Sequence, residues 1–175
     1  MARRYQWFTR RRDGVVTVRL RPEEATLLMQ VGNELRTLLD SGDGAVIERL
    51  FPKAYLDPTE EGREREYAAL VHADLMRSRL DRLAEVLATL EPITQGTKPQ
   101  TIALDDDAVQ EWLVVLNDAR LALGVAVGMT EDLEPDDVDE DDPRRLGIEV
   151  YQLLTWFFGE LVEVALAATP KTGHE

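Results

Sequence analysis

The residues that most often carry chemistry in proteins are scarce in this sequence. Its 175 residues include no cysteine and only two histidines, His72 and His174. The lack of cysteine excludes disulfides, thiolate metal sites, iron–sulfur clusters and thiol nucleophiles. Two histidines are too few for a histidine-rich metal site. His72 lies beside an apolar stripe with no accompanying nucleophile pattern, so we interpret it as a boundary residue with a structural hydrogen bond.

Acidic residues are plentiful, but their spacing favours helix capping and solvation over catalysis. Segment 131–142 holds nine acids and no base, yet Asp136 occupies its sixth position, where a calcium-binding EF-hand loop needs glycine. Asp105, Asp106 and Asp107 open a predicted helix, where the helix dipole favours acids. The sequence contains no glycine-rich phosphate loop, serine elbow or zinc-protease motif. We therefore predict no metal, no cofactor and no catalytic residue.

The most suggestive residues are the arginines of the N-terminal segment. Residues 1–21 hold seven arginines and one acid, a net charge of +6 in a chain of net charge −14, so the remainder carries −20. Arginines that alternate with aromatic residues can hold phosphates and stack on bases, but the acidic body disfavours general binding of nucleic acid or anionic membranes. The competing interpretation is that the arginines pair with the acidic body while the aromatic residues enter the core. The candidate partner-binding residues are Arg3, Arg4, Arg10, Arg11 and Arg12.

A β-hairpin over residues 5–20 would position these arginines. Aromatic residues precede Asp13-Gly14 and β-branched residues follow it, and an Asp-Gly pair suits a tight turn that needs positive φ. The alternating apolar residues after the turn would point at the rest of the protein: Val16, Val18 and Leu20.

The remaining sequence predicts a mainly α fold, a helical bundle of about four main helices within a single domain over residues 1–175. Apolar residues recur at helical spacing between residues 22 and 168. The predicted helices cover residues 22–41, 58–90, 105–128 and 143–168, with a short helical turn at 45–51. The intervening segments are a linker at 92–101, an acidic loop at 131–142 and a tail at 170–175. The predicted apolar stripe of the second helix is Ala69, Ala73, Met76, Leu80, Leu83, Leu87 and Leu90.

The last predicted helix is apolar over most of its surface. Such a helix must be sandwiched within the monomer or must contact a second subunit. We predict a possible homodimer built on the last two helices. The candidate interface residues are Tyr151, Leu154, Trp156, Phe157, Phe158 and Leu161.

The apolar runs of the sequence are too short to suggest a membrane protein. The longest, Leu121–Met129, is about half of the roughly 18 residues that a membrane helix needs. The N-terminal arginines are not followed by the apolar core of a signal peptide. We therefore expect a cytoplasmic protein that does not enter the membrane.

Several stretches, taken in their order along the chain, resemble one known family. They are Phe8–Leu20 with Arg21-Pro22-Glu23-Glu24, Leu50–Tyr55, Trp112-Leu113, Leu116–Gly124 and Tyr151–Leu166. Together they resemble an actinobacterial family described as a domain of unknown function and encoded near the Clp protease adaptor. That family is grouped as the oxidative-stress transcriptional regulator family. The resemblance spans nearly the whole chain.

This resemblance implies a role in gene expression under oxidative stress, with RNA polymerase or a sigma factor as the protein partner. A thiol-based redox switch needs cysteine, so any thiol sensing in relatives cannot operate here. We expect a non-enzymatic regulatory protein that acts through protein–protein contacts. The alternatives are a DNA-associated module that uses the same arginines and an uncharacterised enzyme with carboxylate chemistry.

Overall fold

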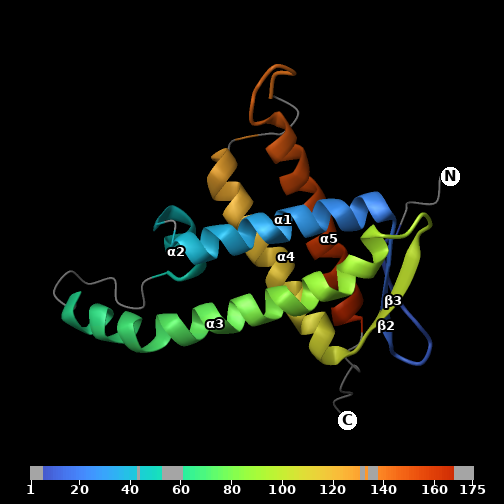
Figure 1. Cartoon of the computed structure of the whole chain (residues 1–175), viewed down its shortest axis with the longest axis horizontal. Helices are drawn as coiled ribbons and strands as arrows, with labels where there is room; N and C mark the ends of the chain where they lie inside the picture. The colour runs from blue at the N-terminus through green and yellow to red at the C-terminus, as the bar shows by residue number, and fades with distance from the viewer. Residues whose placement is uncertain (1–5, 43, 53–60, 131–132, 134–137, 168–175) are drawn as a thin grey trace, which may run out of the picture.

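The structure, a computed structural model, is mainly helical with a small sheet near its N-terminus, which confirms the predicted fold class (Figure 1). It describes residues 6–42, 44–52, 61–130, 133 and 138–167. The helices are α1 (Pro22–Ser41), α2 (Gly44–Leu50), α3 (Glu61–Thr94), α4 (Asp106–Val127) and α5 (Arg145–Leu166). The strands are β1 (Phe8–Arg10), β2 (Val16–Leu20) and β3 (Gln100–Leu104).

The helices pack as two pairs that cross one another. Figure 1 shows α1 lying along α3 and α4 lying along α5, with the short α2 beside α4. The sheet lies at one end of this arrangement, next to the start of α1. Within the described residues, no helix is both long and apolar enough to cross a bilayer.

The boundaries of α1 follow from local sequence signals. Pro22 occupies the first helical position, where its missing N–H leaves no hydrogen bond unmade. The backbone N–H of Arg21 donates to the Glu24 carboxylate at 2.8 Å, which satisfies a group at the helix start. Gly42 ends the helix in the left-handed region at φ +68°, a conformation that glycine adopts without steric cost.

The long helix α3 extends beyond its predicted C-terminal end. It continues past Leu90 and through Pro92 to Thr94. Pro92 stands within the last two turns, so it forgoes a single hydrogen bond near the helix terminus. Ile93 is 1% exposed, and its burial stabilises the added turn. The predicted start of this helix at Asp57-Pro58 lies outside the described residues.

The fully buried residues of α3 lie in its C-terminal half. Leu83, Leu87 and Leu90 are buried as predicted, but Ala73 is exposed and Met76 is only partly buried. The predicted stripe is therefore wrong at Ala73, whereas Met76 and Leu80 are partly buried and pack against the core, and the side chain of Ala69 lies outside the described residues. Figure 1 shows that the N-terminal half of α3 projects beyond the other long helices.

A third strand, β3, stands where the sequence predicted a linker and the approach to a helix. It pairs antiparallel with β2, with Ile102 opposite Val18 and Leu104 opposite Val16, so the sheet has the order β1-β2-β3. Leu104 is 2% exposed. The linker prediction for residues 92–101 is corrected accordingly: it spans the end of α3, a short turn and the first residues of β3.

Candidate functional site

The arginine hairpin is fixed to the helices by two consecutive aromatic residues. Trp7 stacks on Phe157 of α5, with ring centroids 4.3 Å apart and planes inclined by 25°. Phe8 is fully buried and meets both Phe157 and Trp112 edge to face at 6.0 Å. Aromatic pairs in these geometries stabilise beyond the area they bury. The expectation that the aromatic residues enter the core is confirmed for Trp7 and Phe8, whereas Tyr5 lies outside the described residues.

Two glutamates add polar contacts to this anchor. Glu160 of α5 accepts a hydrogen bond from the backbone N–H of Phe8 at 2.8 Å. Glu24 of α1 accepts one from the Trp7 indole Nε1 at 3.1 Å and also accepts from Arg21 at the helix start. The anchor therefore ties β1 to both α1 and α5, which are distant in sequence.

The turn of the hairpin has the geometry that its sequence predicts. The N–H of Gly14 donates to the Arg11 carbonyl at 3.0 Å, and the N–H of Arg11 donates to the Val15 carbonyl at 2.8 Å. Gly14 has φ +89°, which a residue with a side chain adopts only with strain. Asp13 accepts from the N–H of Val15 at 3.2 Å. Val16, Val18 and Leu20 of β2 are buried on the inner face, as expected.

The structure brings three of the five candidate arginines together at the start of this turn. Arg11 and Arg12 are exposed, and Arg10 is partly buried. The Arg10 guanidinium lies beside Gly14, since a Cβ at that glycine would be 3.7 Å from its Nη2 atom. Arg3 and Arg4 lie outside the described residues.

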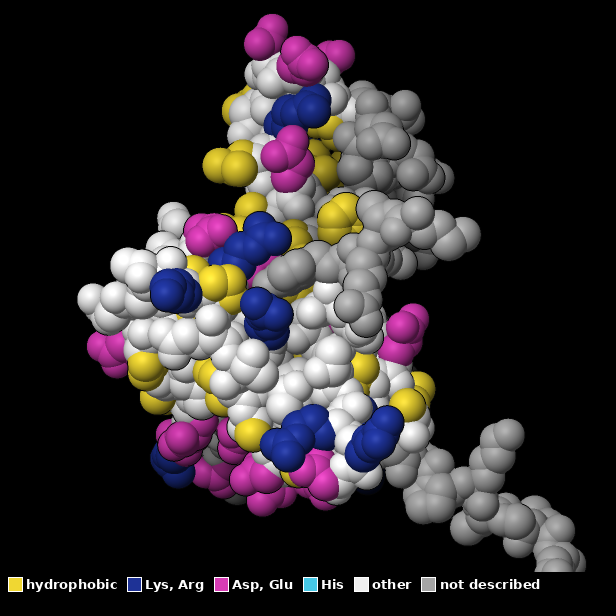
Figure 2. All heavy atoms as spheres, turned by 90° about the vertical axis from the view of Figure 1, so that its right-hand side faces the viewer, with side chains coloured by type: hydrophobic (Ala, Val, Ile, Leu, Met, Phe, Trp, Pro, Cys, Tyr) yellow, Lys and Arg dark blue, Asp and Glu magenta, His cyan; other side chains and the backbone are white. Residues whose placement is uncertain are grey.

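The predicted pairing of the tip with the acidic body is not what the described residues show. Arg11 forms an ion pair with Asp13 at 2.8 Å, within its own turn. No described acid pairs with Arg10 or Arg12. Figure 2, which views the sheet side of the molecule, shows Lys and Arg side chains in separate groups from the upper to the lower part of this face, several of them beside acidic side chains. Within the described part of the chain, Arg10 and Arg12 are therefore not engaged by an acidic group, whereas Arg11 is engaged by Asp13.

A second charged cluster lies between α3, α4 and the end of α2. Asp118 of α4 is 4% exposed and forms an ion pair with Arg79 of α3. Arg79 also donates to the Leu50 carbonyl at 3.1 Å and lies over the Phe51 ring, 4.8 Å from its centroid. Burial raises the pKa of the Asp118 carboxyl, while the hydrogen bond and charge of Arg79 and the charge of Arg82 act to lower it.

This cluster is better suited to joining helices than to acting on a substrate. It links the end of α2 to α3 and α4, and the Asp118 side chain is only 6% exposed. A carboxylate that acts as a general acid or base must lie within hydrogen-bond reach of a substrate. Asp118 instead faces Arg79.

His72 packs differently from the prediction. Its ring is tilted against Phe51, with centroids 5.4 Å apart and planes at 52°. Among the described residues it makes no hydrogen bond, so the predicted structural hydrogen bond is replaced by an aromatic contact. The predicted position of His72 at the boundary of the core is retained, because the residue is partly buried.

Two acids for which the sequence predicted a helix cap or an acidic loop, Asp105 and Asp142, lie at such positions in the structure. Asp105 accepts a hydrogen bond from the Ala108 N–H at 2.8 Å and so caps α4. Asp142, at the end of the acidic segment, pairs with Arg144 at 2.9 Å. In the described part of the chain, no three Asp, Glu, His or Cys side chains converge as metal ligands would.

The six candidate interface residues on α5 divide into buried and accessible ones. Leu154, Phe157 and Leu161 are at most 1% exposed within the monomer. They belong to its own core and cannot form a subunit interface. Tyr151 and Phe158 are partly buried, and Trp156 is 55% exposed. The sandwiching of α5 within one chain thus explains most of its apolar surface.

Sequence reasoning missed the two glutamates that hold the hairpin in place. Neither Glu24 nor Glu160 is among the candidate site residues that the sequence predicts. A signal for Glu24 existed in its position three residues after Arg21, which matches the reciprocal part of a capping box. No local signal pointed to Glu160, because its partner is 152 residues away.

Comparison with known proteins identifies a family but no characterised relative. The family model described as a domain of unknown function (DUF2017) matches residues 2–165, so the chain belongs to this family. Curated proteins and solved structures gave no match.

Proposed function

We propose that this DUF2017 protein is a non-enzymatic regulatory protein whose arginine hairpin binds an acidic surface on a partner protein. One observation carries the proposal. A turn with three adjacent arginines is held against the helices by Trp7 and Phe8, and only one of the three pairs with a described acid. A rigidly held cationic loop loses little conformational entropy on binding, which favours recognition.

The charge distribution supports a selective rather than a general cation site. Residues 22–175 carry a net charge of −20 around a segment of net charge +6. Long polyanions would be repelled by most of the molecule, whereas a compact acidic patch could meet the tip alone. The resemblance of the sequence to the oxidative-stress transcriptional regulator family would make RNA polymerase or a sigma factor this partner, in an actinobacterial cell.

Affinity capture with a matched charge control tests the proposal. The tip variant replaces Arg10, Arg11 and Arg12 with alanine. The control variant makes the same change at three exposed arginines of the helices: Arg49, Arg77 and Arg82. We expect the tip variant to lose at least tenfold of the captured partner, while the control retains it. Equal capture by wild type and tip variant would refute the proposal.

The DNA-associated alternative uses the same arginines and predicts a different response. Anisotropy of a labelled duplex should then show binding at low salt that falls steeply as the salt concentration rises, because phosphate contacts release counterions. The hairpin offers few cations and the body repels phosphates, so we expect no such binding. Salt-dependent binding that the tip variant abolishes would favour the DNA alternative.

We also propose a homodimer, and its interface would be the accessible face of α5. Of the predicted interface residues, Trp156 presents the largest exposed fraction, 55%. Light scattering at micromolar concentration should show a dimer that Trp156→Glu dissociates. A monomer in the wild type would refute the dimer.

A further inference from the structure

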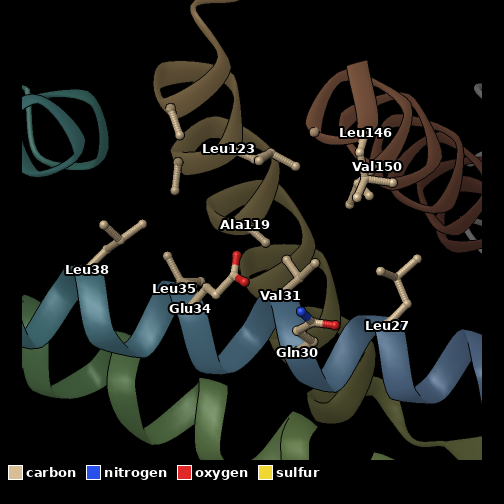
Figure 3. Close-up of a pocket in the computed structure, with 13 residues that line it drawn as sticks. Leu27, Gln30, Val31, Glu34, Leu35, Leu38, Ala119, Leu123, Leu146 and Val150 are labelled. Atoms are coloured by element: carbon tan, nitrogen blue, oxygen red, sulfur yellow. The ribbon is translucent and has the colours of Figure 1, made fainter. Parts of the chain in front are cut away.

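An apolar groove runs along α1 where this helix faces α4 and α5. Figure 3 shows Leu27 and Val31 of α1 on one side of it, with Leu123 of α4 and Val150 of α5 across from them. The cavity has a volume of about 240 Å³. It is separate from the hairpin, and nothing in the proposed function uses it.

The length of the groove matches a short helix. Its α1 wall runs from Leu27 to Leu38, twelve residues whose ends lie about 16 Å apart, or three turns, at the helical rise of 1.5 Å per residue. A neighbouring hollow shares Gln30, Glu34 and Leu38 with it, so the depression continues along the surface of α1. Such an elongated shape favours an extended or helical segment over a compact metabolite.

The floor of the groove leaves room for close approach. Its α4 and α5 side is lined largely by small residues: Ala119, Ala122, Ala126 and Gly147. Small residues let the backbone of an added helix come near. Leu146 stands at the lip and is 72% exposed, the largest exposed fraction among the described large apolar residues. A partner helix that covered Leu146 would remove this exposed surface from water.

The charge of the groove selects its occupant. Glu34 is its only charged lining residue and has no ion-pair partner among the described residues. The two arginines at the start of α5 are already engaged, because Arg144 pairs with Asp142 at 2.9 Å and Arg145 with Glu149 at 3.1 Å. An incoming helix would therefore meet an uncompensated negative charge.

We propose that this groove binds an amphipathic helix of about three turns from a partner protein, with apolar residues at i, i+3 or i+4 and i+7 and a Lys or Arg placed against Glu34. Helix-in-groove recognition uses this anchor spacing. A second copy of the chain is not the proposed occupant, because the homodimer proposed above uses the Trp156 face of α5, which lies outside this groove.

A designed peptide of about 14 residues with this pattern and a fluorescent label serves as the probe. Two control peptides are used. The first is scrambled, so it keeps the composition but loses the apolar face. The second keeps the apolar face but carries Glu in place of Lys and Arg. Binding is followed by anisotropy, and the bound site is mapped by amide chemical-shift changes in the full-length protein. We expect saturable binding of the basic peptide alone, with shifts confined to the α1, α4 and α5 walls.

Two leucine variants on α5 test whether the peptide binds in the groove. Leu146→Glu should weaken the probe at least tenfold, whereas Leu166→Glu, at a leucine of similar exposure (68%) outside the groove, should not. Glu34→Lys should reverse the preference toward the acidic peptide, with Glu48→Lys on α2 as its control. All four positions are exposed, and thermal unfolding by circular dichroism verifies that each variant folds.

Several outcomes would overturn the proposal: equal binding of the scrambled peptide, shifts that map to the hairpin, or no binding at millimolar peptide. A dimer dissociated by Leu146→Glu would also overturn it, since a second copy would then occupy the groove. The hairpin arginines are intact in every variant, so failure here is distinguishable from failure of the proposed function.

Discussion

The Trp7 indole lies flat against the ring of Phe157, and these two residues join the first strand to the last helix across 150 positions of sequence. Phe157 is fully buried and also meets Phe8 edge to face. The position of the arginine turn relative to the helices therefore depends on one aromatic cluster. The strand pairing β1-β2 sets the shape of the hairpin, but this cluster fixes its orientation.

Loss of the Trp7 ring should both destabilise the protein and weaken partner capture. Burying a large aromatic side chain contributes roughly 3 to 5 kcal/mol when it is complete, and Trp7 is only partly buried. We expect Trp7→Ala to lower the free energy of unfolding in urea by about 2 kcal/mol. Leu75→Ala, which removes an exposed apolar side chain from α3, should change it by less than about 0.5 kcal/mol.

The capture experiment separates the two effects of Trp7. If the anchor orients the tip, Trp7→Ala should reduce partner capture under conditions where the variant is still folded, although all the arginines remain. Full capture by the folded variant would show that the turn binds without the anchor.

Local signals predicted the parts of the fold that depend on neighbouring residues. Pro22 and Gly42 mark the ends of α1, Asp105 caps α4, and Asp13-Gly14 forms the turn. Each of these features is decided within four residues, by a cap, a fixed φ or a positive φ. The element types and most of their bounds follow from such features.

Features that depend on distant partners were beyond local prediction. β3 contains only Ile102 and Leu104 as alternating large apolar residues, and its pairing is decided by β2, more than 80 residues earlier. Periodicity showed that α5 was apolar but did not say what would cover it. Packing within the monomer buries Leu154, Phe157 and Leu161, so the predicted subunit interface shrinks to the exposed side of the helix.

The Asp118–Arg79 pair predicts a specific dependence of stability on pH. Because burial raises the pKa of Asp118 in the folded state, the native protein holds this proton more tightly than the unfolded chain does. The contribution of Asp118 is therefore complete below its unfolded pKa of about 3.9 and is lost as pH rises through the higher folded value. Asp118→Asn removes this titration.

The measurement is the difference in unfolding free energy between wild type and Asp118→Asn across this pH range. The unfolding free energy of the wild type should fall relative to that of Asp118→Asn as pH rises. The contributions of all other titrating groups cancel in this difference. A difference that moves the opposite way would show that Arg79 outweighs burial. Asp118→Ala should cost roughly 3 kcal/mol at neutral pH, since it leaves Arg79 without its counterion.

Asp142 should titrate in the opposite sense. Its pKa is lowered by the side-chain hydrogen bond and then the backbone hydrogen bond from Arg144. Its contribution to stability is therefore present above the unfolded pKa and lost as pH falls through the lower folded value. In Arg144→Ala, the carboxyl carbon of Asp142 should titrate at a higher pH by NMR, but only part of the way, because the backbone bond at 2.7 Å is retained. An unchanged titration would contradict this assignment.

Two glycines of α5 should respond to alanine with opposite signs. A Cβ on Gly147 would lie 2.5 Å from Cγ1 of Val127 on α4, and a β-branched side chain has little rotamer freedom with which to move away. Gly147→Ala should therefore force α4 and α5 apart and lower the free energy of unfolding by about 1 to 3 kcal/mol. Gly159 has nothing within 4 Å of such a Cβ, so Gly159→Ala should raise it by about 0.5 to 1 kcal/mol through helix propensity alone.

The same pair of variants tests whether the α4–α5 contact shapes the groove. Gly147 lines the groove and Gly159 does not, so only Gly147→Ala should alter binding of the basic helical peptide. Urea unfolding gives the stability of each variant, and peptide anisotropy gives its affinity. Equal stability changes for the two variants would show that α5 shifts freely against α4, and the close packing at Val127 would then not limit the geometry of the groove.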